Sequence, residues 1–211
     1  TGATEFDNLD KVKFSSRAEL AERFGLDVKK PWFVVLHHPT PLDVVAFNDQ
    51  IRPLLRVMAA RRDVEKIVIY PNADTGGNVF IREINRYRGR SDFHVSPHLP
   101  RLDYLSFLKR AELLIGNSSS GIVDSTHFKI PSIQVGTREK GRERGRNVIA
   151  CGYDELSIRR AVARATSLAF RAICRRAVSP YGRGGAARKI VRIIEKHIDR
   201  QDLLLKRFHD V

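Results

Sequence analysis

The sequence predicts an α/β fold with a doubly wound parallel sheet. Five short apolar or β-branched runs, each followed by loop residues, alternate with segments of helical period. The runs are almost continuously apolar, which is typical of strands that are covered on both faces. Repeated alternation of strand and helix indicates βαβ units. The expected strands span residues 32–36, 66–70, 93–95, 113–115 and 132–135.

The helices are expected before, between and after these strands. Ser16 and Glu19 have the spacing of a capping box, so a short helix is expected at 18–24, ended by Gly25. Segments with helical period between the strands span residues 44–58, 79–87, 102–111 and 122–128. Two longer helices, at 155–177 and 186–208, are expected to close the chain on either side of the turn-rich segment 179–185.

Length and composition favour one well-packed domain. The chain has 211 residues, 42% of them hydrophobic, and single domains usually contain about 100–200 residues. We therefore expect one domain over 1–211, with a helical tail at 186–208. Its first residues lack the basic and apolar regions of a signal peptide, and no apolar run is long enough to cross a membrane. These features favour a soluble, cytoplasmic protein without a membrane partner.

The net charge of +14 suggests a polyanionic or phosphate-bearing partner. The basic residues are dispersed over the expected helices and accompany no zinc finger or RNA-recognition signature. We interpret most of the charge as solvated helix faces, except for the cluster at 138–146, and do not expect nucleic acid as a partner. Cys151 and Cys174 lie too far apart for a CxxC metal or redox site, so no metal site is expected and both thiols are interpreted as structural.

Ligands of open α/β sheets bind at the carboxyl ends of the strands, so the loops after the strands hold the candidate site. Gly116–Gly121 is a serine-rich loop between a strand and a helix, where main-chain amides and three hydroxyls can converge on a phosphate. A serine N-cap at a glycine-permitted turn explains the same residues. Asp124, one turn further on, can accept hydrogen bonds from a ribose or simply complement the helix dipole.

The basic loop after the last expected strand is the second candidate element. Arg138, Lys140 and Arg142 are bracketed by glycines, so they can reach a diphosphate or remain on a mobile solvated loop. His38, fixed in direction by Pro39, is either a proton shuttle or hydrogen-bonding group or a strand cap. Asn72 can reach a sugar or base, although its segment is also good turn chemistry.

Five segments are informative through their order and spacing: HHPT, YPNADTGGN, IGNSSSGIVDS, FKIPSIQVGTREKGRERGRNVI and SPYGRGGAARKI. Together they resemble the C-terminal half of the hydrolysing UDP-N-acetylglucosamine 2-epimerases, and the resemblance covers the chain over residues 1–194. The resemblance implies a Rossmann-like domain, the C-terminal half of a two-domain GT-B-type fold, that binds UDP in the interdomain cleft. It implies no cofactor. The apolar end of the last helix is expected to pack either on the absent domain or on another subunit, and we expect a homo-oligomer.

The resemblance assigns roles to the candidate residues. The candidate catalytic residue is His38, and the candidate UDP-binding residues are Ser118, Ser119, Ser120, Gly121, Asp124, Arg138, Lys140, Arg142 and Asn72. The implied reaction eliminates UDP from UDP-N-acetylglucosamine and adds water to release N-acetylmannosamine, which feeds sialic or related nonulosonic acid synthesis. Non-hydrolysing epimerases typically carry an HRREN-like segment where this chain has HHPT, so the hydrolysing branch is favoured.

Two departures from the family pattern matter. Asp124 stands where glutamate is usual, which shortens the reach toward a ribose. The N-terminal domain that supplies carboxylates and another histidine is absent from this sequence, so we expect the isolated chain to be inactive. The alternatives are a non-hydrolysing epimerase, a GT-B glycosyltransferase domain, and a non-catalytic basic module that binds an acidic partner.

Overall fold

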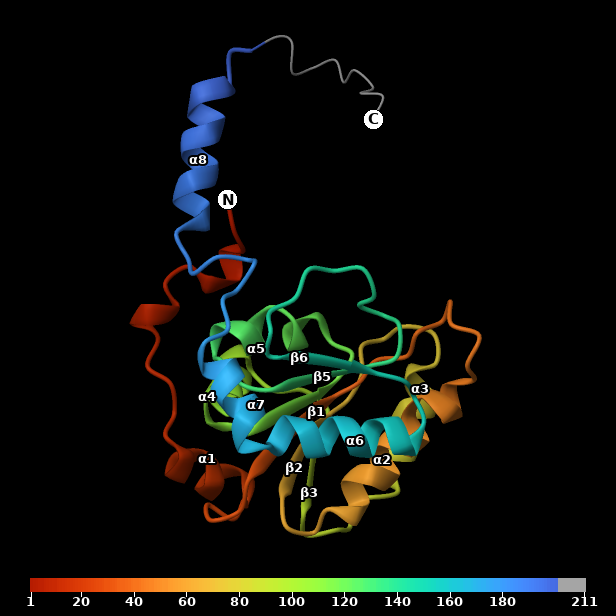
Figure 1. Cartoon of the computed structure of the whole chain (residues 1–211). Helices are drawn as coiled ribbons and strands as arrows, with labels where there is room; N and C mark the ends of the chain where they lie inside the picture. The colour runs from red at the N-terminus through yellow and green to blue at the C-terminus, as the bar shows by residue number, and fades with distance from the viewer. Residues whose placement is uncertain (201–211) are drawn as a thin grey trace. The chain divides into compact units, whose positions relative to one another are not determined.

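A computed structural model describes residues 1–200 of the chain (Figure 1). It comprises two compact units, one formed by Lys13–Pro180 and the other, within the described residues, by Thr1–Val12 together with 181–200. Each unit is described by itself. The expectation of one nucleotide-sugar-binding domain over 1–211 stays a prediction. Within residues 1–200, no helix combines the length and apolar character that spanning a membrane requires.

The larger unit contains a six-stranded sheet in which all neighbouring strands are parallel. The strands are β1 (Trp32–Leu36), β2 (Glu65–Ile69), β3 (Phe93–Ser96), β4 (Leu113–Gly116), β5 (Ser132–Val135) and β6 (Val148–Cys151). Their order is β3-β2-β1-β4-β5-β6. The chain thus moves outward from β1 in one direction, returns to β4 on the other side, and continues outward, which is the doubly wound arrangement. The five expected strands are confirmed.

The sixth strand was missed. β6 is an edge strand in which Ile149 is buried while Ala150 is exposed, so it lacks the continuous apolar run of the other strands. It also follows directly on the basic loop 138–146, whose composition gives no strand signal. An edge strand needs to bury only part of its surface, which weakens the pattern that the sequence can show.

The helices of this unit match the expected segments to within a few residues, except at one break. They are α1 (Arg17–Phe24), α2 (Phe47–Ala60), α3 (Gly77–Asn85), α4 (Arg101–Arg110), α5 (Asp124–His127), α6 (Glu155–Thr166) and α7 (Leu168–Arg175). The capping box at α1 is confirmed, because the Ser16 side chain accepts from the Glu19 amide and the Glu19 side chain accepts from the Ser16 amide.

The prediction of one helix over 155–177 is wrong. Ser167 adopts an extended backbone with ψ 147°, which ends α6, and its hydroxyl accepts from the Phe170 amide to begin α7. A serine hydroxyl at an N-cap accepts from an amide that, in a continuous helix, would donate to a carbonyl of the previous turn. The apolar period continues through the break, so the sequence pattern alone does not reveal it.

The helices cover the two faces of the sheet and bury a core on each. On one face, α2 and α6 pack against each other (Figure 1), and their side chains meet the strand residues Phe33, Val35 and Ile133. On the other face, Trp32 and the α1 residue Phe24 contact Phe107 of α4, with ring centroids 5.9 and 5.0 Å from it. Burial of both faces explains why the strands are apolar throughout.

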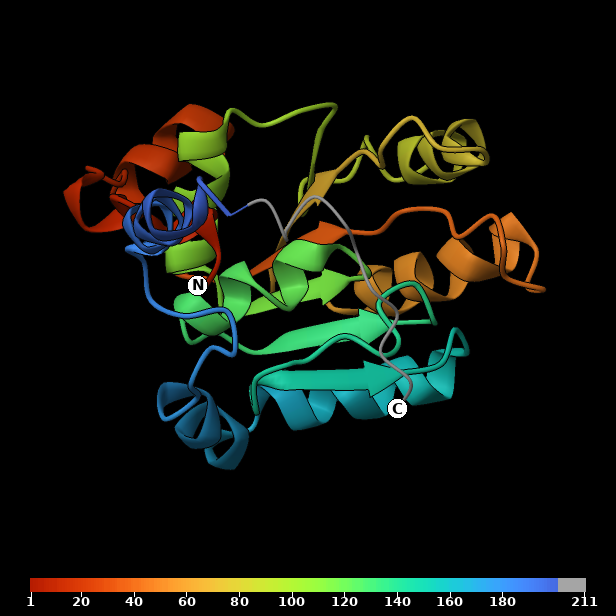
Figure 2. The same ribbon diagram turned by 90° about the horizontal axis from the view of Figure 1, so that it is seen from above.

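The strand order places a switch point between β1 and β4. Connections leave these adjacent strands in opposite directions, so a crevice forms at their carboxyl ends. Gly116, at the end of β4, lies so close to β1 that an added Cβ would be 1.9 Å from the Leu36 carbonyl oxygen. In Figure 2 the strand arrows lead to the side on which the loops after the strands gather. This edge contains the candidate site.

The smaller unit is built around α8 (Ala186–His197) and two short 3-10 helices, Thr4–Phe6 and Leu9–Lys11. The Asp7 carboxylate accepts from the amides of Ala186 and Ala187 at 2.9 and 2.7 Å. It therefore caps the first turn of α8, and these bonds lower its pKa. The helix expected at 186–208 ends at His197, and residues 201–208 of that prediction lie outside the described part of the chain.

Candidate functional site

Asn117 joins the loops after β1 and β4. Its side chain is buried, with Oδ1 accepting from the His38 amide at 2.7 Å and Nδ2 donating to the His38 carbonyl at 2.8 Å. Its own amide donates to the Leu36 carbonyl. A primary amide can donate and accept at once, so one side chain satisfies both main-chain groups of His38. Asn117 was not singled out from the sequence, although it lies in the serine-rich motif.

His38 lies half-buried between the loops after β1, β2 and β5. Its Nδ1 accepts a hydrogen bond from the Asn72 amide at 3.0 Å. Burial, and next the positive charge of Arg138, lower the pKa of His38 to about 4, whereas the Asp74 carboxylate acts in the opposite direction. The imidazole is therefore neutral near pH 7.

The preceding residue, His37, points into the core. Its ring is 1% exposed, stacks on Phe80 at a centroid distance of 5.5 Å and meets the edge of Tyr153. Neither ring nitrogen has a hydrogen-bond partner among the described residues. Burial, followed by the charge of His38, lowers the pKa of His37 to about 3. His37 thus packs as a neutral aromatic ring beneath the loop.

The serine-rich corner after β4 begins with the 3-10 helix η3 (Ser119–Gly121). The Ser118 hydroxyl caps it by accepting from the Ser120 amide, and the Ser120 hydroxyl bonds to Tyr104. Ser119 is exposed. The three hydroxyls therefore have separate surroundings, contrary to the expectation that they converge. Within the described residues, the amides of Ser118 and Ser119 make no hydrogen bond.

Gly121 and Asp124 occupy the far side of this corner. Gly121 is buried, and an added Cβ would lie 2.1 Å from Nε2 of the Gln134 side chain. The absence of a side chain at Gly121 therefore allows close packing against β5. Asp124 is the first residue of α5 and is half-buried. Burial raises the pKa of Tyr104, and the negative charge of Asp124 acts on it in the same direction. Asp124 thus lies on the Tyr104 side of the corner.

The basic loop after β5 reaches the serine-rich corner through Arg138. Its Nη1 donates to the Asn117 carbonyl at 3.2 Å and to the Glu139 carboxylate at 3.0 Å. Glu139 is buried and also accepts from Arg142 at 2.8 Å. Nε and Nη2 of Arg138 make no hydrogen bond in the described part of the chain. Lys140 is exposed, and no contact brings it to Asn117 or His38.

A second tie holds the same basic loop from the β1 side. The Asp43 carboxylate accepts from the Thr137 hydroxyl at 2.6 Å and from the Tyr153 hydroxyl at 3.0 Å. Hydrogen bonds to the Thr137 side chain, and then to Tyr153, lower the pKa of Asp43. Because Thr137 precedes Arg138, this tie positions the loop that carries the guanidinium. Asp43 and Tyr153 were not anticipated from the sequence.

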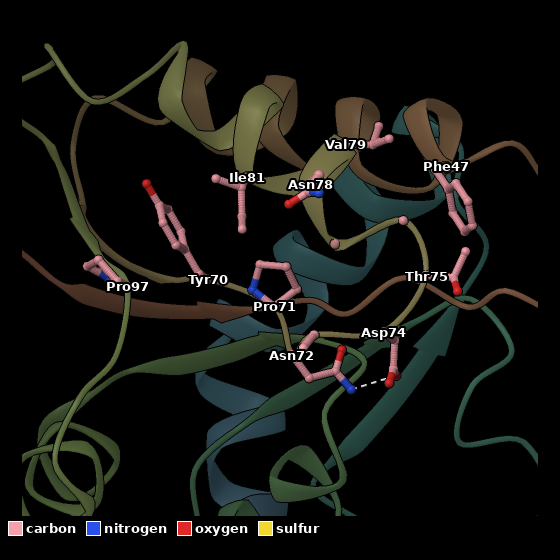
Figure 3. Close-up of a pocket in the computed structure, with 13 residues that line it drawn as sticks. Phe47, Tyr70, Pro71, Asn72, Asp74, Thr75, Asn78, Val79, Ile81 and Pro97 are labelled. Carbon is pink, nitrogen blue, oxygen red and sulfur yellow. Dashed lines mark hydrogen bonds between the residues drawn. The ribbon is translucent and has the colours of Figure 1, made fainter.

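Two hollows flank Asp74 at this edge. One, of about 350 Å³, is lined by residues 39–43 together with Asp74, Thr137 and Arg138. The other, of about 610 Å³, is lined by the loop after β2 and by the start of α3 (Figure 3). In Figure 3 the Asn72 side chain donates to Asp74, with a distance of 2.6 Å between Nδ2 and Oδ2. Asn72 therefore contacts both His38 and Asp74.

The structure brings one subset of the predicted residues together. His38, Asn72 and Arg138 are connected through hydrogen bonds that meet at Asn117 and His38. Ser118 belongs to the same corner, since its carbonyl accepts from Gln134 and it follows Asn117 directly. Arg142 reaches the cluster only through Glu139. Lys140 is not brought to it by any contact among the described residues.

These features define a class: a doubly wound parallel α/β domain whose polar loops meet at the switch point between its two central strands. The family model described as UDP-N-acetylglucosamine 2-epimerase matches residues 1–195. The chain therefore belongs to the UDP-N-acetylglucosamine 2-epimerase family.

Individual relatives agree with this assignment. The chain is 30% identical over its whole length to the polysialic acid biosynthesis protein P7 of Escherichia coli, of which it covers 54%. It is 31% identical over 148 residues, 70% of the chain, to the hydrolysing UDP-N,N'-diacetylbacillosamine 2-epimerase of Legionella pneumophila, of which 39% is covered. The chain thus spans about half the length, or less, of these relatives.

The solved structures show the same fold. The UDP-GlcNAc 2-epimerase of Neisseria meningitidis bound to UDP-GlcNAc matches 93% of this chain with a TM-score of 0.75 and 13% identity, and 54% of that chain is covered. The fold class expected from the sequence is confirmed: the chain forms a Rossmann-like domain of the kind found in GT-B-type epimerases.

Proposed function

We propose that the switch point of this domain binds UDP, and that the domain serves a hydrolysing UDP-N-acetylglucosamine 2-epimerase. The observation that carries the proposal is the hydrogen bond of Arg138 to the Asn117 carbonyl. It brings the basic loop to the peptide group that joins Asn117 to Ser118, at the start of the serine-rich corner, where the amides of Ser118 and Ser119 make no hydrogen bond in the described part of the chain. Cationic and amide donors around one corner suit a diphosphate.

The electrostatic balance of the corner supports an anionic ligand. Nη1 of Arg138 is held by Asn117 and Glu139, while Nε and Nη2 keep their donors available. The buried Glu139 carboxylate fixes both Arg138 and Arg142 and so limits their conformational freedom. A preorganised guanidinium loses less entropy on binding than a mobile one, which favours tight recognition.

The other candidate residues are assigned according to where they lie around the proposed diphosphate site. Asp124, on the Tyr104 side of the corner, is proposed to accept hydrogen bonds from the ribose. His38 and Asn72, on the β1 and β2 side, are proposed to face the diphosphate and the sugar. Lys140 and Arg142 are proposed to add long-range attraction for the anion. No metal or cofactor enters these assignments.

Two observations favour the hydrolysing branch and a role in nonulosonic acid synthesis. The segment after β1 reads His37-His38-Pro39-Thr40, whereas non-hydrolysing epimerases typically carry an HRREN-like segment there. Two relatives point the same way, since one is named a polysialic acid biosynthesis protein and the other a hydrolysing epimerase. The proposed reaction eliminates UDP from UDP-N-acetylglucosamine and hydrates the intermediate to N-acetylmannosamine. We propose a cytoplasmic location and a homo-oligomeric state for the same protein.

Calorimetry with UDP tests the binding site on the chain itself. We expect saturable binding by the chain, and weaker binding by Arg138→Ala. Arg144→Ala is the matched control, because Arg144 is an exposed arginine of the same loop. No heat of binding at millimolar UDP, or equal losses for the two variants, would remove the site from this corner.

Product analysis tests the branch. A full-length protein containing this chain is incubated with UDP-N-acetylglucosamine, and the products are followed by proton NMR. Free N-acetylmannosamine together with UDP supports the hydrolysing reaction. UDP-N-acetylmannosamine as the product would assign the protein to the non-hydrolysing branch, and sugar transfer to an acceptor would assign it to the glycosyltransferases.

A further inference from the structure

The main-chain amide of Asn72 constrains the chemistry of His38. This amide can only donate, and its partner at 3.0 Å is Nδ1 of the imidazole. Nδ1 must therefore be the unprotonated nitrogen as long as this bond exists. In a neutral imidazole the proton then lies on Nε2, which leaves Nε2 as the nitrogen available to a ligand.

The surrounding contacts fix the ring in this arrangement. Asn117 holds both main-chain groups of His38, and the Asn72 side chain is tied to Asp74 at 2.6 Å. Two charged groups act on the ring, Asp74 after β2 and Arg138 after β5, while the neighbouring His37 points into the core beneath it. Burial and Arg138 together outweigh the attraction of Asp74, so the ring stays neutral.

We propose that the Asn72 amide holds His38 as the neutral tautomer with its proton on Nε2, and that His38 serves the bound nucleotide sugar as a hydrogen-bond donor. Asp74 is the positioning residue that acts through Asn72. The inference rests on the proposed UDP site, and it names the role of His38 within it. His38 stabilises charge on the leaving diphosphate, and another group removes the proton from C2.

This role differs from that of a proton shuttle in what it requires. A shuttle must give and take a proton at one nitrogen near neutral pH. Nδ1 of His38 is occupied by a donor, and Nε2 already carries a proton, so neither nitrogen is a base. A fixed N–H group nevertheless lowers the energy of an oxyanion that develops beside it, because its dipole needs no reorganisation.

The tautomer can be read directly from the chain without any ligand. Long-range proton–nitrogen correlation spectra of the labelled chain distinguish a pyridine-like nitrogen from a pyrrole-like one. The His38 signals are assigned by their loss in His38→Gln. We expect a pyridine-like Nδ1 and a pyrrole-like Nε2 at pH 7. A pyrrole-like Nδ1, or protonation of both nitrogens, would overturn the proposal whether or not UDP binds.

Two pairs of variants test the cause of the tautomer. Asn72→Pro removes the amide proton, whereas Asn72→Ala keeps it and loses only the side-chain bond to Asp74. We therefore expect a larger shift toward the other tautomer in the first variant than in the second. Asp74→Ala removes the partner of the Asn72 side chain, whereas Asp74→Asn keeps an acceptor, although both remove the charge. Within this second pair, we expect a tautomer change in Asp74→Ala and none in Asp74→Asn. An unchanged ring in a folded Asn72→Pro chain contradicts the role of the amide, and equal spectra of the Asp74 pair contradict the role of Asp74.

UDP binding then tests the donor role. His38→Gln presents an amide donor and is expected to retain UDP affinity within about threefold, whereas His38→Phe should lose roughly tenfold to a hundredfold. His98→Gln, at an exposed histidine, is the control.

The pH dependence of UDP binding separates a neutral from a charged His38. The terminal phosphate of UDP itself titrates at about pH 6, so the wild type and His38→Gln should show the same pH dependence. A loss of affinity at higher pH in the wild type alone would mean that charged His38 binds. Failure of UDP to bind at all counts against the proposed function, and the tautomer result remains separate.

Discussion

Nη1 of Arg138 donates to the main-chain carbonyl of Asn117, which lies 3.2 Å away and belongs to a different loop. The bond closes the switch point, because Asn117 is in turn bound to His38 after β1. Loops that lie far apart along the chain therefore form one hydrogen-bonded group. Loss of any member is expected to affect the position of the others.

Arg138→Ala is expected to weaken UDP binding by about 1.5–3 kcal/mol, the usual contribution of hydrogen bonds to charged groups. Arg138→Lys should recover part of the loss, because lysine keeps the charge but not the planar set of donors. Titration calorimetry of the folded variants measures both. A dissociation constant unchanged in Arg138→Ala would exclude Arg138 from the site.

Asp124→Asn is expected to weaken UDP more than it weakens inorganic pyrophosphate. A carboxylate accepts hydrogen bonds from both ribose hydroxyls, whereas an amide offers one oxygen. Pyrophosphate has no ribose and therefore serves as the control ligand. Equal losses for the two ligands would show that Asp124 acts on the corner as a whole and not on a ribose.

The sequence predicted the sheet because its central strands bury both faces. The five runs were recognisable from apolar character alone, and their polar loops pointed to the correct edge. Lys66 shows the limit of this approach, because it is fully buried inside β2, where its ammonium pairs with Asp92 at 2.5 Å. A buried lysine is tolerated only with such a partner, and its position is not visible in the pattern.

The candidate site was predictable in outline only. His38, Ser118 and Arg138 stood out because histidine, serine and arginine in loops after strands carry recognisable chemistry. Asn117 and Asp43 did not, because their function is to tie loops that are distant in sequence. The helix expected from residue 44 begins only at Phe47, since the Gln50 side chain binds Thr40 and Val45 and holds that segment as a loop.

Acidification is expected to destabilise the larger unit through His37. The pKa of His37 is lowered from 6.5 to about 3 in the folded chain, so between these values the unfolded chain binds one more proton than the folded chain. The free energy of unfolding therefore rises with pH in this window and falls on acidification. For His37 the loss between pH 7 and pH 5 is about 2 kcal/mol.

His37→Phe is expected to remove that part of the pH dependence while keeping a ring against Phe80. Urea unfolding of the wild type and the variant at both pH values provides the measurement. The wild type should lose about 2 kcal/mol more than the variant on acidification. Parallel losses in the two proteins would mean that His37 is not buried as a neutral group.

Gly116→Ala is expected to disrupt the contact between β1 and β4. The added Cβ would lie 1.9 Å from the Leu36 carbonyl oxygen, and the residue has φ +151°, so both backbone strands would have to shift. Overpacking of this kind costs about 1–3 kcal/mol or more, and the shift should also weaken UDP binding. Gly89→Ala is the control, because an added Cβ there meets nothing within 4 Å. Denaturation midpoints of the two variants decide the matter: equal stability would show that the close approach of the central strands is not maintained in solution.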